Sequence, residues 1–235
     1  MKEWAGDKHI KIWDQVWRED VYATPDLRKI KAKKKADIFL NKFSERISEN
    51  TTILDIGCGN GYVSEYILKE TLANVLAFDQ SSEALKRCER LRGNPRFHLR
   101  QGNAEEIPYS DEKADIVFCI GVLEHIKDWR KCLEEIKRVL KPGGYVYLVS
   151  SNIFSAMYLQ WVWCHITGKW KYGYQNNLRP NRLKKMLEEY SFETQDYMVI
   201  EGWGDHDALS LVDHFFRFFS KSIGRYIIYI GRKKQ

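Results

Sequence analysis

The chain has 235 residues, with 38 Lys and Arg against 32 Asp and Glu, so its formal net charge is +6. Apolar residues make up 44% and charged residues 30%, a composition typical of a globular protein that excludes global disorder, a collagen-like repeat and a coiled-coil rod. The mild excess of positive charge permits an anionic ligand or surface without requiring nucleic acid. The length fits one domain, because domains of this kind contain roughly 100–200 residues.

The first 48 residues predict a helical extension ahead of the main domain. Thr24 and Pro25 have the residue types of a helix cap and a first helical position. Apolar residues then recur at helical spacing, which predicts a helix to about Ser48. Its other face is basic, and we interpret this face as solvated, with a nucleic-acid or phospholipid surface as the alternative. The basic residues are Arg28, Lys29, Lys31, Lys33, Lys34 and Lys35.

Strand and helix patterns alternate from residue 50 to residue 150. This alternation predicts a parallel sheet covered by helices on both faces. A helix from Pro180 and two later strand-like segments follow without a linker, so we expect a single domain. Its parts are the extension 1–48, a core 50–150, a substrate-facing segment 151–223 and a final strand 224–235. The predicted strands are 52–56, 74–78, 96–100, 114–120, 145–149, 194–200 and 225–230.

Cysteine usage and apolar runs predict the compartment. An odd number of cysteines without a CxxC pair indicates reduced thiols rather than disulfides or a zinc site. The charged N-terminus does not resemble a signal peptide, and the longest apolar segment, 154–166, is shorter than a membrane span. We therefore expect a cytoplasmic protein with no transmembrane segment and no metal. The residues His206, Asp207, Asp213 and His214 match no metal motif.

A glycine loop follows the first predicted strand of the core. The segment Asp55–Gly61 reads DIGCGNG, and its glycines allow a sharp turn and a close approach to a ligand. The next helix offers free N–H groups at its start. Asp79 ends the second strand, at the spacing expected for an acid that accepts hydrogen bonds from ribose hydroxyls. Tyr62 stands where the dinucleotide fingerprint has its last glycine, which disfavours a nicotinamide-dependent oxidoreductase.

These motifs together resemble a known family. Asp55–Gly61, Asp79, Gly102–Glu105, Asp115–His125 and Leu140–Gly144 are similar, in order and spacing, to the motifs of class I S-adenosylmethionine-dependent methyltransferases. The likeness covers about residues 50–150 and is greatest to the small-molecule, methyltransferase type 11-like branch. It implies a Rossmann-like doubly wound sheet of seven strands, in the order 3-2-1-4-5-7-6, with the last strand antiparallel.

The resemblance also implies a cofactor, S-adenosyl-L-methionine, with S-adenosyl-L-homocysteine as product. By this likeness, the glycine loop passes along the methionine part, Asp55 fixes the loop or contacts the amino group, and Asp79 holds the ribose. Asn103 and Ala104 meet the adenine edge, although this branch usually has Asp where this chain has Asn103. The expected cofactor-binding residues are Asp55, Gly57, Cys58, Gly59, Gly61, Asp79, Gln80, Asn103, Ala104, Glu105, Ile120 and Gly121.

Two further features concern the acceptor. Glu124 and His125 are expected to start the helix after the fourth strand, where His125 is a candidate general base; the alternative is that Glu124 complements the helix dipole and His125 only packs. Aromatic residues crowd the segment 154–174, which suits core packing, a substrate lid or a membrane surface. Upstream, Trp13, Trp17 and Tyr22 are expected to close over the cofactor.

We therefore expect an enzyme that methylates a small, partly apolar acceptor, aromatic or lipid-like in character. The segment 119–122 reads CIGV rather than the Asn/Asp-Pro-Pro-Tyr motif of nucleic-acid amino methyltransferases, so no nucleic-acid partner is expected. Peripheral membrane contact is compatible with the sequence. A methyltransferase of RNA or protein and a non-catalytic cofactor-binding module remain as alternatives.

Overall fold

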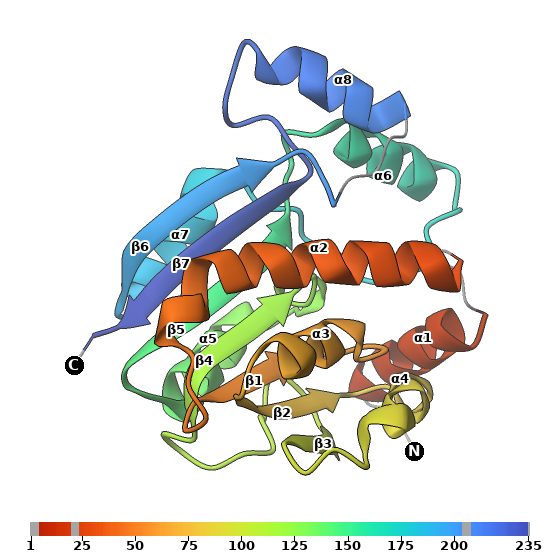
Figure 1. The fold of residues 1–235 in the computed structure, drawn as a ribbon. Coiled ribbons are helices and arrows are strands. Elements are labelled where there is room, and N and C mark those ends of the chain that lie inside the picture. Colours follow the sequence, from red (N-terminus) through yellow and green to blue (C-terminus); the bar gives the residue numbers. More distant parts are fainter. Residues whose placement is uncertain (1–4, 20–23, 204–207, 235) are drawn as a thin grey trace.

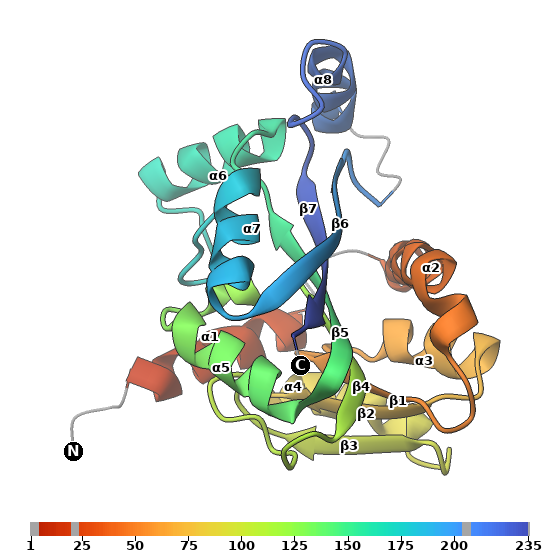
Figure 2. The ribbon, with the colours of Figure 1, turned by 90° about the vertical axis from the view of Figure 1, so that its left-hand side faces the viewer.

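The computed structural model describes residues 5–19, 24–203 and 208–234, and its centre is a seven-stranded sheet between two layers of helices (Figures 1 and 2). The strand order is β3-β2-β1-β4-β5-β7-β6. The first five strands run parallel, and β7 is antiparallel to both β5 and β6. The predicted fold and strand order are thus confirmed. The strands are β1 (Thr52–Ile56), β2 (Asn74–Asp79), β3 (Phe97–Gln101), β4 (Ala114–Ile120), β5 (Leu140–Ser151), β6 (Phe192–Ile200) and β7 (Tyr226–Lys233).

Each face of the sheet has its own buried core. On one face, α2 (Pro25–Phe43), α3 (Tyr62–Glu70) and α4 (Ser82–Cys88) pack against side chains such as Phe118. On the other face lie α5 (Trp129–Val139) and α7 (Pro180–Glu189), as Figure 2 shows. The apolar runs of β1 and β4 fit this arrangement, since a parallel strand between two helical layers is buried on both sides.

The remaining helices lie around the carboxyl ends of the parallel strands. Figure 1 shows α1 (Ala5–Glu19) beside the ends of β1 and β2, and α6 (Ala156–Ile166) and α8 (Ala208–Arg217) beyond the end of β5. None of the described helices is both long and apolar enough to span a bilayer. Ligands of open parallel sheets bind at this edge, so these three helices border the expected site.

Several predicted boundaries need correction. The helix from Pro25 is capped by the Thr24 hydroxyl as predicted, but it ends at Phe43 and a short 3₁₀ turn covers 44–46. The helix after β2 is short, because α4 ends at Cys88 and a 3₁₀ turn, 89–91, follows it. The third, sixth and last strands are each displaced or extended by one to three residues. β5 begins at Leu140 rather than at 145, because its first residue already pairs with Ala114 of β4.

Candidate active site

A cavity of about 1250 Å³ opens where β1, β2, β4 and β5 end. It brings together every predicted site residue except Gly61. Gly61, at the end of the loop, faces α4 instead, where an added Cβ would be 2.9 Å from the Cys88 sulfur. The predicted residues on the cavity wall are Asp55, Gly57, Cys58, Gly59, Asp79, Gln80, Asn103, Ala104, Glu105, Ile120, Gly121 and His125.

The glycine loop forms the floor of the cavity with its backbone. Gly57 and Gly59 have φ of 66° and 55°, a left-handed conformation that glycine adopts without steric cost. A Cβ on Gly57 would be 2.5 Å from the Val122 side chain, and one on Gly59 would be 2.7 Å from the Trp17 ring. Both positions therefore require glycine for conformation and for space.

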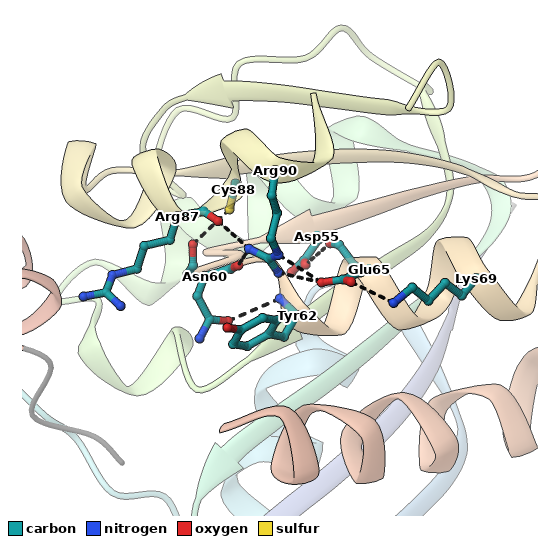
Figure 3. Close-up of polar contacts among 10 residues, drawn as sticks. Asp55, Asn60, Tyr62, Glu65, Lys69, Arg87, Cys88 and Arg90 are labelled. Carbon is teal, nitrogen blue, oxygen red and sulfur yellow. Dashed lines mark hydrogen bonds and ion pairs between the residues drawn. The ribbon is translucent and has the colours of Figure 1, made fainter. Parts of the chain in front are cut away.

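The far side of the loop is clamped from α4 and the turn after it (Figure 3). The Arg90 guanidinium donates to the Asn60 carbonyl at 2.7 Å and makes two bonds to Glu65, at 2.8 and 3.0 Å. The Cys88 thiol donates to the Gly59 carbonyl at 3.2 Å. These contacts hold the loop rigidly against the sheet, as a preformed binding site requires.

Asp55 is a buried carboxylate at the carboxyl end of β1. Its Oδ2 accepts a hydrogen bond from the Ser64 hydroxyl at 2.5 Å, and Ser64 is itself buried on α3. Burial raises the pKa of Asp55 to about 7, and the Ser64 bond opposes this rise. The carboxyl is therefore partly protonated near neutral pH, and a donor or cation placed beside it would favour the charged form.

Asp79 has a similar setting at the end of β2. Its carboxylate accepts backbone N–H bonds from Gly59 and Ser81, each at 2.9 Å, so it joins the glycine loop to the start of α4. Burial raises its pKa to about 6, against the effect of these bonds. Each oxygen of a carboxylate can accept more than one hydrogen bond, so both retain acceptor capacity toward the cavity.

Helix α1 lies across the cavity and is anchored to α4. Asp14 accepts hydrogen bonds from the Ser81 hydroxyl at 2.6 Å and the Glu83 backbone at 3.3 Å, and Arg87 donates to the Trp17 carbonyl at 2.5 Å. Trp13 and Trp17 line the cavity, as predicted for a covering segment, whereas Tyr22 lies outside the described residues.

The residues Glu124 and His125 do not start a helix, contrary to expectation. They belong to a separate 3₁₀ turn, 123–125, and α5 begins later, at Trp129, where Asp128 caps it. The interpretation of Glu124 as a complement to the helix N-terminus is therefore wrong. Its Oε1 instead accepts bonds from the backbone and hydroxyl of Ser151, at 3.1 and 2.9 Å.

Glu124 has a second oxygen that is directly relevant to the cavity. Oε2 is buried and accepts no hydrogen bond from any residue that the structure describes, while Glu124 lines the cavity. The Nδ2 of Asn177 and the Nε1 of Trp161, also on the cavity wall, have the same status among those residues. Buried polar atoms are normally satisfied, so this end of the cavity has the polar groups to bind a ligand.

His125 has a defined tautomer. Its Nδ1 lies 2.9 Å from the Tyr174 carbonyl, which can only accept, so Nδ1 carries a proton. In the neutral imidazole, Nε2 is then the basic nitrogen. The edge of the ring packs against Trp13, with 4.9 Å between ring centroids, so α1 and the turn 123–125 meet across the cavity.

Comparison with known proteins agrees with this geometry. The family model described as "Methyltransferase domain" matches residues 54–148, which contain the loop, both aspartates and the turn 123–125. The ubiquinone biosynthesis O-methyltransferase of Alkalilimnicola ehrlichii is 31% identical over 153 residues, 60% of either chain. Residues 54–148 therefore form a methyltransferase domain of the class I S-adenosylmethionine-dependent type.

Other similar methyltransferases differ in substrate. The tRNA U34 carboxymethyltransferase of Nautilia profundicola is 35% identical over 102 residues, 43% of this chain and 34% of that protein. A chain in the complex of the Haloferax volcanii Trm112 methyltransferase activator with a methyltransferase has the same fold, with a TM-score of 0.74, 16% identity and coverage of 94% and 97%. This chain spans 34–65% of the length of the curated relatives it matches.

Some features of the methyltransferase site were missed by sequence reasoning. Arg28, Lys31 and Lys35 of the basic run line the cavity, so that face is not simply solvated. Their spacing of three and four residues on one helix was the available signal. The free oxygen of Glu124 had no such signal, because its burial depends on Ser151, 27 residues away.

The described His and Asp residues near the end of the chain, Asp213 and His214, have different partners. His214 lies 3.0 Å from Glu201, and Asp213 accepts the Ala156 N–H at 2.6 Å, while His206 and Asp207 are outside the described residues. Within the described residues, no group of three or more His, Cys, Asp or Glu side chains is arranged to hold a metal.

Proposed function

We propose that this protein transfers a methyl group from S-adenosyl-L-methionine to a small, partly apolar acceptor and releases S-adenosyl-L-homocysteine. The observation that carries the proposal is the convergence of Asp55, Asp79 and the glycine loop on one cavity, opposite an aromatic wall. The residues suit the cofactor, since two buried carboxylates with spare acceptor capacity face hydroxyl and amino donors, and backbone without Cβ atoms admits a close ligand.

In this proposal each cofactor-facing residue has a role that fits its setting. Asp79 accepts hydrogen bonds from the ribose hydroxyls, and Asp55 fixes the loop and faces the amino group. Gly57 and Gly59 give the ligand room along the backbone. Gln80, Asn103, Ala104, Glu105, Ile120 and Gly121 enclose the nucleoside, with Cys58 packed beside it. The Asn103 oxygen already accepts the Glu105 N–H at 3.0 Å and so holds this turn in place.

Methyl transfer requires alignment more than covalent help from the protein. The sulfonium supplies an activated methyl carbon; the acceptor's lone pair forms the new bond as the carbon–sulfur bond breaks and its electrons return to sulfur. The protein must hold donor and acceptor in line and exclude water. The rings of Trp13, Trp161 and Trp170 on the cavity wall supply apolar surface for this purpose.

A proton leaves only if the acceptor is a hydroxyl, an acidic carbon or an ammonium group. We assign that proton to His125, whose Nε2 is the basic nitrogen while Nδ1 is held by the Tyr174 carbonyl. Glu124, with its free Oε2, would orient a donor group of the acceptor. The aromatic character of the wall favours an acceptor with an apolar body and few polar groups.

Calorimetric titration with S-adenosylhomocysteine tests the cofactor assignment. We expect micromolar binding by the wild type, no binding of NAD, and a loss of about 10- to 100-fold in affinity for Asp79→Ala, since bonds to a charged acceptor contribute roughly 1.5–3 kcal/mol. Asp37→Ala, which removes an exposed aspartate on α2, is the matched control and should bind normally. A folded wild type that does not bind would refute the proposal.

The affinity for S-adenosylhomocysteine should also depend on pH. In the free protein the pKa of Asp79 is about 6 and that of Asp55 about 7, both raised by burial. Ligand donors bind the ionised carboxylates, so affinity should be highest above about pH 7.5 and should fall as both groups are protonated toward pH 5. In Asp79→Asn, the decrease in affinity near pH 6 should disappear, because the group that titrates there is absent. An affinity that is constant from pH 5 to pH 8 would contradict both roles.

RNA is the second candidate acceptor, and the observation that favours it is the row of cations Arg28, Lys31 and Lys35 on the cavity wall. One of the similar proteins is a tRNA carboxymethyltransferase. If RNA is bound, its affinity should fall steeply with salt, with one counterion released for each phosphate neutralised. A small neutral acceptor would show no such dependence.

A further inference from the structure

Helix α8 buries its acidic residue and exposes its apolar side chains, the reverse of an ordinary surface helix. Its acid, Asp213, is buried and accepts the Ala156 N–H at 2.6 Å, with the Arg225 guanidinium 3.8 Å away. The exposed residues of α8 and the turn after it are instead mainly apolar: Leu211, Val212, Phe215, Phe216, Phe218 and Phe219. Phe218 and Phe219 are 89% and 71% exposed. A surface helix normally does the opposite, so this face is a candidate interaction surface.

Helix α6, which packs against α8, carries a second set of exposed apolar residues on the side away from the cavity. Met157, Gln160, Trp161 and Cys164 face the cavity at helical spacing. Leu159, Trp163 and Ile166 fall on another side and are exposed, Ile166 to 81%. The two helices lie next to each other in both views (Figures 1 and 2). We call the exposed apolar residues of α6, α8 and the turn after α8 the outer apolar face.

Apart from Glu201, the exposed charges next to the outer apolar face are positive within the part of the chain that the structure describes. The chain has no Asp or Glu from residue 154 to 187, and from 208 to 234 it has only the buried Asp213. Lys169 lies 4.6 Å from the centre of the Trp163 ring, and Lys221 is exposed just after the phenylalanines. The nearby Glu201 is paired with Arg217 at 3.6 Å, and the His214 Nδ1 lies 3.0 Å from its other carboxylate oxygen. Apolar residues bordered by cations complement an anionic lipid surface.

We propose that the outer apolar face docks on an anionic phospholipid bilayer. The phenylalanines enter the boundary between headgroups and acyl chains, and Trp163 and the two lysines lie at headgroup level. A second copy of the chain fits less well, because pairing two identical faces would bring their cationic borders together. The mode is attachment to one leaflet, since none of the described helices could span the bilayer.

Docking would also provide a route by which an acceptor reaches the cavity. This route rests on the proposed methyl transfer. With α6 between bilayer and cavity, a lipid-soluble acceptor would pass from the membrane to the aromatic wall without crossing water. The acceptor class is then a membrane-dissolved molecule with a nucleophilic head and a long apolar body. The docking itself does not depend on the reaction.

Vesicle flotation tests the docking. We expect the full chain to bind vesicles of phosphatidylcholine with phosphatidylglycerol, and the triple variant Phe215→Ser, Phe218→Ser, Phe219→Ser to bind at least about a hundredfold more weakly, because each buried Phe contributes roughly a factor of ten or more. Leu72→Ser is the matched control: Leu72 is 63% exposed but precedes β2, at the other end of the sheet, and its loss should change nothing.

The charge contribution is tested by Lys169→Glu with Lys221→Glu, which leaves the apolar residues in place. Its binding should fall by about fivefold or more per lysine, and so should wild-type binding in high salt or without phosphatidylglycerol. No binding of the wild type to vesicles, or equal binding of the serine variant, would overturn the proposal. So would a wild-type dimer in sedimentation equilibrium that the serine variant loses, since a second copy would then cover the face.

Titration with S-adenosylhomocysteine separates this proposal from the proposed function. The serine variant should bind the nucleoside as the wild type does, which also establishes that it is folded. A wild type that binds vesicles but not S-adenosylhomocysteine would keep the docking and remove the methyl transfer. A wild type that binds S-adenosylhomocysteine but not vesicles would keep the proposed methyl transfer and remove the docking.

Discussion

Asp55→Asn is expected to stabilise the ligand-free protein by about 2–4 kcal/mol at pH 8. Burial raises the pKa of Asp55 from its usual 3.8 to about 7, so folding favours the protonated form. The stability contributed by such a group declines as pH rises from about 4 and reaches its minimum above pH 7. At 1.36 kcal/mol for each tenfold change in acidity, the penalty at pH 8 is about 4 kcal/mol. Asn remains neutral and avoids this penalty.

Urea unfolding at two pH values measures this effect. At pH 8 the variant should be more stable than the wild type. Near pH 4 the difference should shrink to less than about 1 kcal/mol, because Asp55 is then protonated in the folded chain and roughly half protonated in the unfolded chain. The variant should bind S-adenosylhomocysteine more weakly at pH 8. Asp37→Asn, at an exposed site, should change neither property. If Asp55→Asn and the wild type are equally stable at pH 8, the buried carboxylate does not lower the free energy of unfolding, and the prediction is wrong.

The expected trade-off explains why an acid occupies a site where it destabilises the fold. A buried carboxylate with one hydrogen bond from Ser64 is poorly compensated in the free protein. A ligand that brings its own donors supplies the missing partners. The free-energy cost of burying this carboxylate is therefore reduced when a ligand donates to it, an arrangement that is common where a fold is adapted to a ligand rather than to stability.

The core of the fold could be predicted from the sequence because its signals are local. The alternation of apolar strands with amphipathic helices required a parallel sheet, and the family resemblance supplied the strand order. Asp55, the glycines and Asp79 follow strand ends directly, so placing the strands placed these residues on one edge. Boundaries failed where pairing with a neighbour decided them, as at Leu140 against Ala114.

The parts that failed depend on contacts between distant segments. Helix α8 lay in a stretch, 203–223, for which no element was predicted, because its apolar residues face outward and its acid is buried against α6. The local pattern predicts a helix start at Glu124 and His125, where the structure has a 3₁₀ turn, because the pattern does not contain the bond from Ser151 to Glu124. Whether a polar residue is buried is decided by the tertiary structure, which periodicity alone does not contain.

Gly59→Ala is expected to weaken the binding of S-adenosylhomocysteine by about a hundredfold or more. The residue has φ of 55°, where a Cβ costs roughly 1–2 kcal/mol. The added Cβ would also lie 2.7 and 2.8 Å from two carbons of the Trp17 ring, and overpacking of this kind costs about 1–3 kcal/mol. The chain must relieve the contact by moving the loop away from Asp79 or by moving α1 away from the cavity. Either change disrupts the site.

A double-variant cycle separates the two causes. In Gly59→Ala with Trp17→Ala the ring is absent, so only the backbone strain remains and about tenfold or more of the lost affinity should return. Gly93→Ala is the control, because a Cβ there meets nothing within 4 Å. If the losses of the two single variants simply add, the Trp17 ring does not press on the loop. If the double variant recovers, the tryptophan and the glycine act as one unit, in which a helix far from the loop in sequence covers the backbone that only glycine can form.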